Sequence, residues 1–358
     1  MGSFIYNNQN YTFEQIKTGN WFIKDDYIDQ TFTFCKNWLN DQEEFELQTS
    51  GSTGTPKKIN ISRSQMEVSA LATQSFFKIE PDSKLLVCLN TRMIGGKMML
   101  VRGMKWNANI YLTKPEVNPL LLFDENQKID FCAMVPMQIE ACLSDKETAK
   151  KLSNIKILII GGAPSSADLI DRIIQSKINA YQTYGMTETV SHIALAKIEG
   201  SELVYRTLPD VRIGTDDENR LWVEAPMAKE KRLQTNDLVQ LIDTHSFKWI
   251  GRADFTINSG GIKIQAESLE AQLGKYIHPI YGNVSFFVIG QKDQKLGEKV
   301  VLFIETSSKE EKKAQELLTN LKENLQKYHC PKNIYFLPEF VKTDSGKINR
   351  TKTSQICF

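Results

Sequence analysis

The chain has 358 residues, of which 41% are hydrophobic and 24% charged, a composition typical of globular proteins that excludes disordered, collagen-like and low-complexity chains. Lys and Arg number 44 and Asp and Glu 43, so the formal charge of +1 argues against nucleic acid as the main partner. The length predicts one large domain and a smaller one, because it exceeds what a single hydrophobic core usually holds.

Helices and strands alternate between about residues 60 and 185. Ser64 and Glu67 have the spacing of a capping box, which predicts a helix from Ser64 to about Lys78. Short apolar runs predict strands at 84–89, 109–112, 131–135, 156–160 and 180–183, and the segments between them predict helices at 138–143 and 166–175. This alternation predicts an α/β fold with a mainly parallel sheet that is covered on both faces. The first 45 residues predict no particular element.

The pattern changes after Asp210. Short β segments with close turns are expected at 220–223, 238–242 and 247–250. A mixed α+β unit follows Gly251, with strands near 284–289, 300–304 and 334–336 and a charged helix at about 309–327. We therefore predict a large domain at 1–253 and a small domain at 254–358. No Pro-, Gly- or Ser-rich linker separates them, so the predicted hinge is short.

The cysteines and the apolar runs of the sequence indicate the cellular location of the protein. The six cysteines are scattered without a CxxC spacing, so no zinc site is predicted, and Cys88 and Cys132 lie inside apolar runs, as reduced core residues do. No apolar run approaches the roughly 18 residues of a membrane span, and the first residues do not have the pattern of a signal peptide. These features predict a cytoplasmic protein without a membrane partner.

The most informative segment runs from Leu47 to Lys57. Gly51 and Gly54 allow backbone conformations that are closed to other residues, so successive N–H groups can point at one anion. Neighbouring hydroxyl side chains and the Lys57 cation add donors for a polyphosphate. The segment is not a Walker A loop, because no Gly-Lys-Ser/Thr follows. Taken alone, it fits a phosphate-binding loop and a mobile surface loop equally well.

Four further segments follow in order, at 184–188 (Tyr-Gly-Met-Thr-Glu), 235–237 (Thr-Asn-Asp), 251–254 with 259–261 and Glu267, and 342–347 (Lys-Thr-Asp-Ser-Gly-Lys). Together with the 47–57 loop they resemble the nucleotide-binding, hinge and C-terminal lysine motifs of the adenylate-forming superfamily, which includes acyl- and aryl-CoA ligases. Segments 135–138, 161–164, 184–189 and 259–261 are similar to those of the o-succinylbenzoate–CoA ligases of menaquinone biosynthesis. The departures from the superfamily pattern, Lys58, Asn236 and Val341, lie outside the expected contacts.

The resemblance implies a large adenylate-forming domain that is shortened at its N-terminal side, since 46 residues precede Leu47, and a small mobile C-terminal lid. It implies that ATP and Mg²⁺ convert a carboxylic acid, o-succinylbenzoate, into its acyl-adenylate, and that the thiol of CoA then displaces AMP. The alternatives are another aryl- or acyl-CoA ligase, a protein that loads a phosphopantetheinyl carrier, and a non-catalytic nucleotide-binding protein. A homodimer is compatible with all of them.

The resemblance also assigns nucleotide-binding residues. The β- and γ-phosphates would contact Thr49, Ser50, Gly51, Ser52, Thr53, Gly54 and Lys57. The adenine would lie between Tyr184 with Gly185 and a strap made of Gly161, Gly162, Ala163 and Pro164. The ribose hydroxyls would bind Asp237 and Arg252.

Other residues would carry the chemistry. Glu188 would hold Mg²⁺, Thr187 would bond the α-phosphate, and Lys347 would bridge the reacting carboxylate and the α-phosphate as the catalytic cation. Asp254 would be the hinge of the small domain, and Gly261 would line a tunnel for the pantetheine thiol. Each of these acids and cations, taken alone, also fits an ordinary solvated side chain.

The acyl pocket needs a cation for the second carboxylate of o-succinylbenzoate. The segment 90–102 corresponds to one that lines this pocket in similar proteins, and it offers Arg92, Lys97 and Arg102. We predict that Lys97 or Arg92 binds the carboxylate, and the alternative is that these charges form a solvated helix face. His192 is expected near the pocket and is assigned no chemistry.

Overall fold

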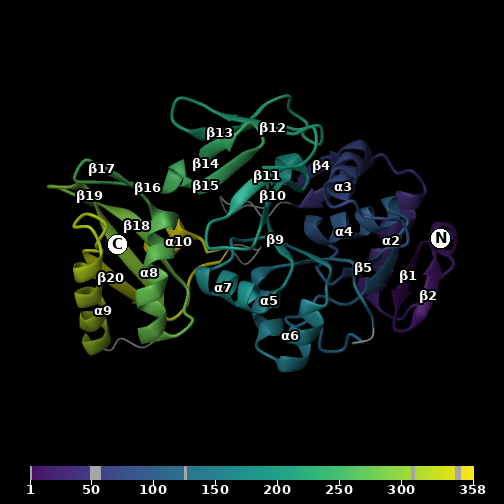
Figure 1. Ribbon diagram of the computed structural model, residues 1–358, viewed down its shortest axis with the longest axis horizontal. Coiled ribbons are helices and arrows are strands. Elements are labelled where there is room, and N and C mark those ends of the chain that lie inside the picture. The colour runs from purple at the N-terminus through teal and green to yellow at the C-terminus, as the bar shows by residue number, and fades with distance from the viewer. Residues whose placement is uncertain (1, 49–57, 125–126, 308–310, 343–347) are drawn as a thin grey trace.

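The computed structural model describes residues 2–48, 58–124, 127–307, 311–342 and 348–358 (Figure 1). The predicted phosphate-binding residues Thr49, Ser50, Gly51, Ser52, Thr53, Gly54 and Lys57 lie outside the described residues, as does the predicted catalytic Lys347. The chain runs from the N-terminus at one end of the long axis to the C-terminal unit at the other (Figure 1).

A block of parallel strands forms the middle of the largest sheet. Its strands run in the order β9-β8-β7-β5-β6-β1. Their bounds are β1 (Ser3–Tyr6), β5 (Lys84–Val87), β6 (Asn109–Leu112), β7 (Phe131–Met134), β8 (Ile157–Ile160) and β9 (Ala180–Gly185). The predicted parallel α/β sheet is therefore confirmed, and β2 (Gln9–Thr12) adds an antiparallel edge to β1.

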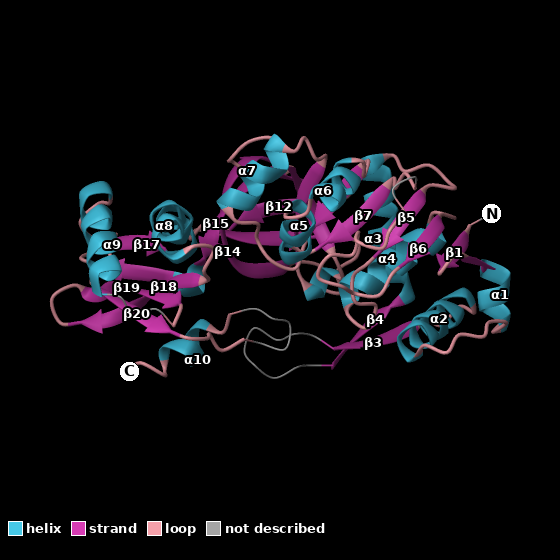
Figure 2. Cartoon of the chain, turned by 90° about the horizontal axis from the view of Figure 1, so that it is seen from below, coloured by secondary structure: helices cyan, strands magenta, loops and turns pink. Residues whose placement is uncertain are grey.

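Helices cover both faces of this block because successive strand residues point to opposite sides. Leu85 and Val87 belong to one hydrophobic core, and Leu86 and Cys88 to a second. The first core lies under α1 (Phe13–Thr18), α2 (Asp26–Leu39), α3 (Arg63–Phe77) and α4 (Ile94–Lys105). The second lies under α5 (Pro136–Leu143), α6 (Lys146–Ser153) and α7 (Ala167–Gln175), which group together in Figure 2.

Antiparallel strands extend the sheet beyond β9. They are β10 (His192–Lys197), β11 (Val204–Thr207), β12 (Arg212–Thr215), β13 (Arg220–Glu224), β14 (Leu233–Asp243) and β15 (Ser246–Arg252), in the spatial order β12-β13-β14-β15-β11-β10. A short 3₁₀ helix, η1 (Thr187–Thr189), separates β9 from β10. A separate hairpin of β3 (Glu44–Gln48) and β4 (Lys58–Ser62) flanks the 49–57 segment in the chain.

The C-terminal unit has hydrophobic cores of its own, whose buried residues run from Ile257 onward, whereas the buried residues of the two larger cores lie at or before Phe247. It begins with η2 (Ala253–Phe255), and its strands are β16 (Thr256–Ser259), β17 (Ile262–Gln265), β18 (Phe286–Asp293), β19 (Gly297–Glu305) and β20 (Asn333–Leu337). Its helices are α8 (Ala266–Tyr281), α9 (Glu311–Asn324) and α10 (Arg350–Ser354). The domain boundary at Asp254 stays a prediction.

The start of α3 differs from the sequence prediction. The capping box is made by Ser62 and Gln65, not by Ser64 and Glu67: Gln65 N donates to Ser62 Oγ at 3.2 Å, and Ser62 N donates to Gln65 Oε1 at 3.1 Å. Gln satisfies this motif as well as Glu does, and Ser62 ends a strand, so its extended backbone suits the cap position.

The cysteine prediction is confirmed for the pair singled out. Cys88 and Cys132 are buried, and their sulfur atoms lie 3.9 Å apart, so they are not disulfide-bonded. Among the described residues, no helix has both the length and the apolar composition that crossing a bilayer requires.

Candidate active site

The carboxyl ends of four parallel strands gather polar and glycine-rich segments. β5 is followed by residues 90–93, β7 by 135–138, β8 by 161–164 and β9 by 186–188. These strands are neighbours in the sheet, so the segments lie along one edge. The strand order also reverses at β5, between β6 and β7, and ligands of open α/β sheets bind at such a switch point. This edge is therefore the candidate site.

The strap at 161–164 is held by Gln182, a residue that the sequence analysis missed. Gln182 Nε2 donates to the carbonyls of Ile160 (3.1 Å) and Ala163 (3.2 Å), and its Oε1 accepts from the Ser165 amide (3.1 Å) and hydroxyl (2.7 Å). The side chain is buried, with 3% of its surface exposed. The sequence does offer a signal for this residue, a glutamine inside a predicted apolar strand, because a buried side-chain amide must find hydrogen-bond partners. Gly162, Ala163 and Pro164 are exposed beside it.

At two positions of the predicted site, the local structure explains why the residue is glycine without any bound ligand. Gly162 has φ of +84°, a conformation that favours glycine. Gly185 ends β9, and a Cβ there would collide with the backbone of Ser191 and His192 where the chain turns into β10. Both are therefore weak evidence for nucleotide binding by themselves.

Asp237 is held at both carboxylate oxygens. Tyr184 Oη donates to Oδ2 at 2.7 Å, and Trp249 Nε1 donates to Oδ1 at 3.2 Å. Burial, then the charge of Asp237, raises the pKa of Tyr184, so its phenol stays a donor. The Tyr184 ring packs edge-on against Phe247, with ring centroids 5.2 Å apart. The structure thus brings together Tyr184 and Asp237, which are 53 residues apart.

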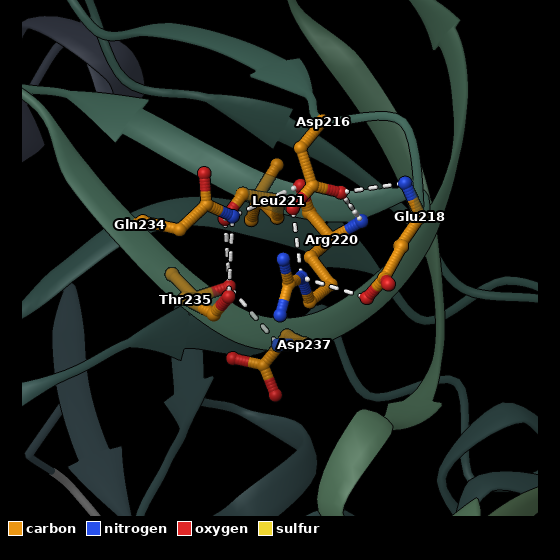
Figure 3. A network of polar contacts seen from close by, with 7 residues as sticks. All are labelled: Asp216, Glu218, Arg220, Leu221, Gln234, Thr235 and Asp237. Atoms are coloured by element: carbon orange, nitrogen blue, oxygen red, sulfur yellow. Dashed lines mark hydrogen bonds and ion pairs between the residues drawn. The ribbon is translucent and has the colours of Figure 1, made fainter.

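The backbone under Asp237 is fixed by a polar network on β13 and β14 (Figure 3). Thr235 Oγ1 donates to the carbonyl of Leu221 at 2.8 Å and accepts from the Asp237 amide at 3.0 Å. Arg220, at the start of β13, pairs at 2.7 Å with Asp216 in the turn before that strand. The Asp237 carboxylate points away from this ion pair (Figure 3), which leaves it available on the Tyr184 side.

Arg252 lies between two acids. Its guanidinium is 3.9 Å from Asp237 Oδ1 but 2.5 Å from Asp254 Oδ2. Burial opposes its charge, but the ion pairs with Asp254 and Asp237 raise the pKa of Arg252 overall. The predicted partners Asp237 and Arg252 are therefore neighbours, while the direct hydrogen bond of Arg252 goes to the predicted hinge residue Asp254.

The predicted metal-binding and α-phosphate residues lie in η1. Glu188 is exposed and Thr187 is half-buried, directly after the carboxyl end of β9. No group of three or more His, Cys, Asp or Glu side chains forms a metal site within the described parts of the chain. The predicted role of Glu188 as a metal ligand therefore stays a prediction.

The three cations of segment 90–102 have different environments. Arg92 is exposed, and its Nε donates to Gln30 at 3.0 Å. Lys97 is half-buried with its ammonium 5.5 Å from the centre of the Phe34 ring, and burial lowers the pKa of Lys97. Arg102 is only 2% exposed. The alternative of a solvated helix face is therefore wrong for Arg102, because this position of α4 is buried.

Arg102 lies in a buried polar cluster. Its NH2 group donates to Ser191 Oγ at 2.8 Å and lies 3.4 Å from His192 Nδ1, and His192 Nε2 is 3.1 Å from Thr73 Oγ1. Burial, and then the charge of Arg102, lowers the pKa of His192, which keeps the imidazole neutral. Burial also lowers the pKa of Arg102 to about 9, so the guanidinium still carries its charge at neutral pH. Among the described residues no hydrogen-bond partner reaches its buried Nε, and no carboxylate pairs with it.

Helix α2 supplies a wall beside this segment. Tyr27 Oη accepts from the Thr91 amide at 2.8 Å, and the hydroxyls of Thr31 and Thr91 are 2.6 Å apart. Gln30 and Phe34, on the same helix, contact Arg92 and Lys97. No element was predicted for the residues that precede the 49–57 loop. The structure forms α2 there, and this helix packs against the candidate acyl pocket.

The tip of the β16–β17 hairpin contains Gly260 and Gly261. Gly260 has φ of +59°, and a Cβ there would collide with the Tyr328 ring. Gly261 has φ of +82° and open space around its Cβ position. Its backbone angle alone therefore favours glycine, and the predicted tunnel role stays a prediction.

Comparisons with known proteins place this geometry in a family. An AMP-binding enzyme model matches residues 47–220, and an AMP-binding enzyme C-terminal domain model matches residues 278–347. The crystal structure of an acyl-CoA synthetase (AMP-forming)/AMP-acid ligase II-like protein from Dyadobacter fermentans is 37% identical, with a TM-score of 0.64 over 95% of this chain and 97% of the other. The chain belongs to the AMP-binding enzymes. The predicted membership of the adenylate-forming superfamily is thereby confirmed.

Several ligases are similar to this AMP-binding enzyme. The 2-succinylbenzoate–CoA ligase of Bacillus cytotoxicus is 25% identical over 384 residues, which cover 97% of this chain and 75% of the ligase. The o-succinylbenzoate CoA synthetase of Bacillus subtilis, solved in complex with its acyl-adenylate intermediate, is 22% identical with a TM-score of 0.75, over 87% of this chain and 68% of the synthetase. At 22% identity, the similarity to the Bacillus subtilis synthetase supports the fold alone.

Proposed function

We propose that this AMP-binding enzyme is an AMP-forming acid–thiol ligase that converts o-succinylbenzoate, ATP and CoA into o-succinylbenzoyl-CoA, AMP and pyrophosphate, as menaquinone biosynthesis requires. The observation that carries the proposal is the meeting of three distant segments at one sheet edge. The strap at 161–164, the Tyr184–Glu188 segment and Asp237 with Arg252 lie at or beside the carboxyl ends of β8 and β9.

The chemistry needs positioning and charge neutralisation more than covalent participation of the protein. A carboxylate oxygen attacks the α-phosphorus of ATP, and the bond from that phosphorus to the bridging oxygen breaks, so pyrophosphate leaves. The thiol sulfur of CoA then attacks the acyl carbon, its proton is lost to solvent, and AMP departs with the acyl oxygen. Donors aimed at the α-phosphate lower the barrier of the first step because negative charge grows there.

Several residues that the structure describes are assigned to the binding of ATP and Mg²⁺. Asp237 and Arg252 would bind the ribose, Tyr184 and the strap would flank the adenine, and Thr187 would bond the α-phosphate. Glu188 fits a Mg²⁺ ion, since Mg²⁺ in nucleotide sites commonly uses one or two carboxylates together with phosphate oxygens and water. The bound ion would neutralise phosphate charge.

The remaining assignments complete the proposal, and those at 49–57 and 347 fall outside the described residues. The loop residues between Thr49 and Lys57 would bind the β- and γ-phosphates, and Lys347 would contact the reacting oxygens. Asp254 would serve as the hinge between 1–253 and 254–358, and Gly261 would line the thiol path. These roles rest on the motif resemblance and the family membership.

The buried Arg102 supports a dicarboxylic acid. A buried cation without a carboxylate is costly unless an anion binds nearby, and Ser191 already directs a polar group toward it. We therefore place the second carboxylate at Ser191 and Arg102. The half-buried Lys97 is the next candidate and the exposed Arg92 the weakest. Buried thiols that form no disulfide, such as Cys88 and Cys132, support a cytoplasmic location.

The test is pyrophosphate release with Mg-ATP and a panel of acids, with and without CoA, followed by mass analysis of the products. Release with o-succinylbenzoate, and thioester only when CoA is present, supports the proposal. Turnover of benzoate, phenylacetate or a medium-chain fatty acid instead would retain the ligase chemistry and reject the menaquinone role. Release that CoA does not stimulate would indicate carrier loading.

A further inference from the structure

Asp237 receives one protein donor on each carboxylate oxygen. Tyr184 Oη reaches Oδ2 at 2.7 Å and Trp249 Nε1 reaches Oδ1 at 3.2 Å. Arg252 is 3.9 Å from Oδ1 and makes its hydrogen bond to Asp254 instead. Trp249 is thus the hydrogen-bond donor to Oδ1 within the described residues.

Both donors are fixed by the same strand. Trp249 lies on β15, where it pairs with Val239 of β14, two residues after Asp237. Its half-buried ring packs against the large hydrophobic core. Phe247, two residues earlier on β15, packs against the Tyr184 ring. The register of β14 and β15 therefore sets the orientation of the carboxylate as well as its position.

We propose that Trp249 is a positioning residue for nucleotide binding, which orients Asp237 so that the free lone pairs of its carboxylate accept hydrogen bonds from both ribose hydroxyls. The inference rests on the proposed function, in which Asp237 binds the ribose. A carboxylate has about four acceptor positions, and the two protein donors occupy one on each oxygen. The indole N–H is a donor only, so it does not compete with Asp237 for the hydroxyl protons.

The test measures equilibrium binding of ATP, 2′-deoxyATP and 3′-deoxyATP, which does not depend on the acid substrate. Trp249→Phe removes the N–H donor, and replacing Trp249 by 3-benzothienylalanine removes it while keeping the shape of the ring. Trp222→Phe is the matched control, because Trp222 lies on β13 in the same sheet, where it pairs with Gly214 and Gln234, and carries Arg232 over its ring. Thermal unfolding of each variant reports whether it folds.

The wild type is expected to prefer ATP to both deoxynucleotides. Loss of a hydrogen bond to a charged group should raise the Kd for ATP about tenfold in both Trp249 variants. In these two variants the Kd for each deoxynucleotide should rise far less, so the preference for ATP over the deoxynucleotides becomes smaller. Trp222→Phe should keep the wild-type preference for ATP. If all three nucleotides lose affinity equally, or if the benzothienyl variant binds like the wild type, Trp249 is only a packing residue. Absence of ATP binding in the folded wild type would overturn the proposed function together with this inference.

Discussion

Two arginines in different parts of the molecule, Arg102 buried and Arg350 partly buried, have opposite surroundings. Arg350, in the C-terminal unit, donates to Glu270 at 2.8 Å, and its guanidinium lies 4.5 Å from the centre of the Phe255 ring. Arg102, in the large sheet region, is only 2% exposed and contacts Ser191 and His192. The Arg350 side chain is 16% exposed and has a carboxylate to compensate its charge, whereas no carboxylate among the described residues pairs with Arg102.

The difference separates a structural charge from a functional one. Arg350 starts α10 and joins it to α8 and to β18, because Glu270 also accepts from the Val288 amide at 2.8 Å. That arrangement is complete without a ligand. The cluster around Arg102 has no negative charge in the described residues, so it favours an anion supplied by substrate. Four predictions test this comparison.

The largest effect is expected for Arg102→Met. Removing the cation should lower kcat/KM for o-succinylbenzoate by roughly 10²–10³, which corresponds to about 3–4 kcal/mol for a desolvated charge pair. The melting temperature should stay the same or rise, because a buried, uncompensated charge is lost. Pyrophosphate release with o-succinylbenzoate and with benzoate measures the effect. Equal losses with the two acids would contradict a carboxylate site at Arg102, and Lys97→Met tests the next candidate on the same helix.

Arg350→Met should destabilise the C-terminal unit by about 3 kcal/mol, because it leaves Glu270 buried without its partner. The double variant Glu270→Gln/Arg350→Met should recover most of that loss. Urea unfolding followed by circular dichroism at pH 8 measures the free energies. A double variant as unstable as the single one would show that the arginine acts through its packing on Phe255 instead of through its charge.

The Glu270 carboxyl should also make stability depend on pH. Burial raises the pKa of Glu270 to about 7 even though Arg350 favours the charged form. The folded protein therefore binds this proton more tightly than the unfolded chain does, and the resulting stabilisation is complete below about pH 4.5 and lost as the pH rises to about 7. Relative to Glu270→Gln, the wild type should lose about 1–3 kcal/mol across that interval. Parallel pH profiles of the two proteins would contradict the assignment.

The smallest effect is expected for Arg92→Gln. Arg92 is exposed and hydrogen-bonded to Gln30 of α2, so its removal should change kcat/KM for o-succinylbenzoate by no more than about twofold. The same assay with Arg102→Met provides the comparison. A hundredfold loss in Arg92→Gln would restore the prediction from sequence that Arg92 holds the second carboxylate.

Local patterns predicted the central parallel strands β5 to β9 well, but not β1, β2, β10, β11 and β12. The strand at 109–112 was predicted with its observed bounds, and the strands near 84, 131, 157 and 180 were placed within a few residues. Their apolar runs carry this information because both faces of a parallel sheet are buried. The capping box was misplaced by two residues, since a Ser-x-x-Gln pattern at Ser62 competes with the Ser-x-x-Glu pattern at Ser64.

Motif order by itself determined the family of this protein and the residues that are candidates for nucleotide binding, because each motif is a short run whose backbone and side chains act together. Tertiary structure decided which of those residues meet and which charges are buried. Gln182 holds the strap, Trp249 donates to Asp237 from a neighbouring strand, and Arg102 lies beside His192, 90 residues away. Burial and compensation of charge depend on packing between segments that are distant in the chain, so no local pattern could reveal that Arg350 has a carboxylate partner while Arg102 has none among the described residues.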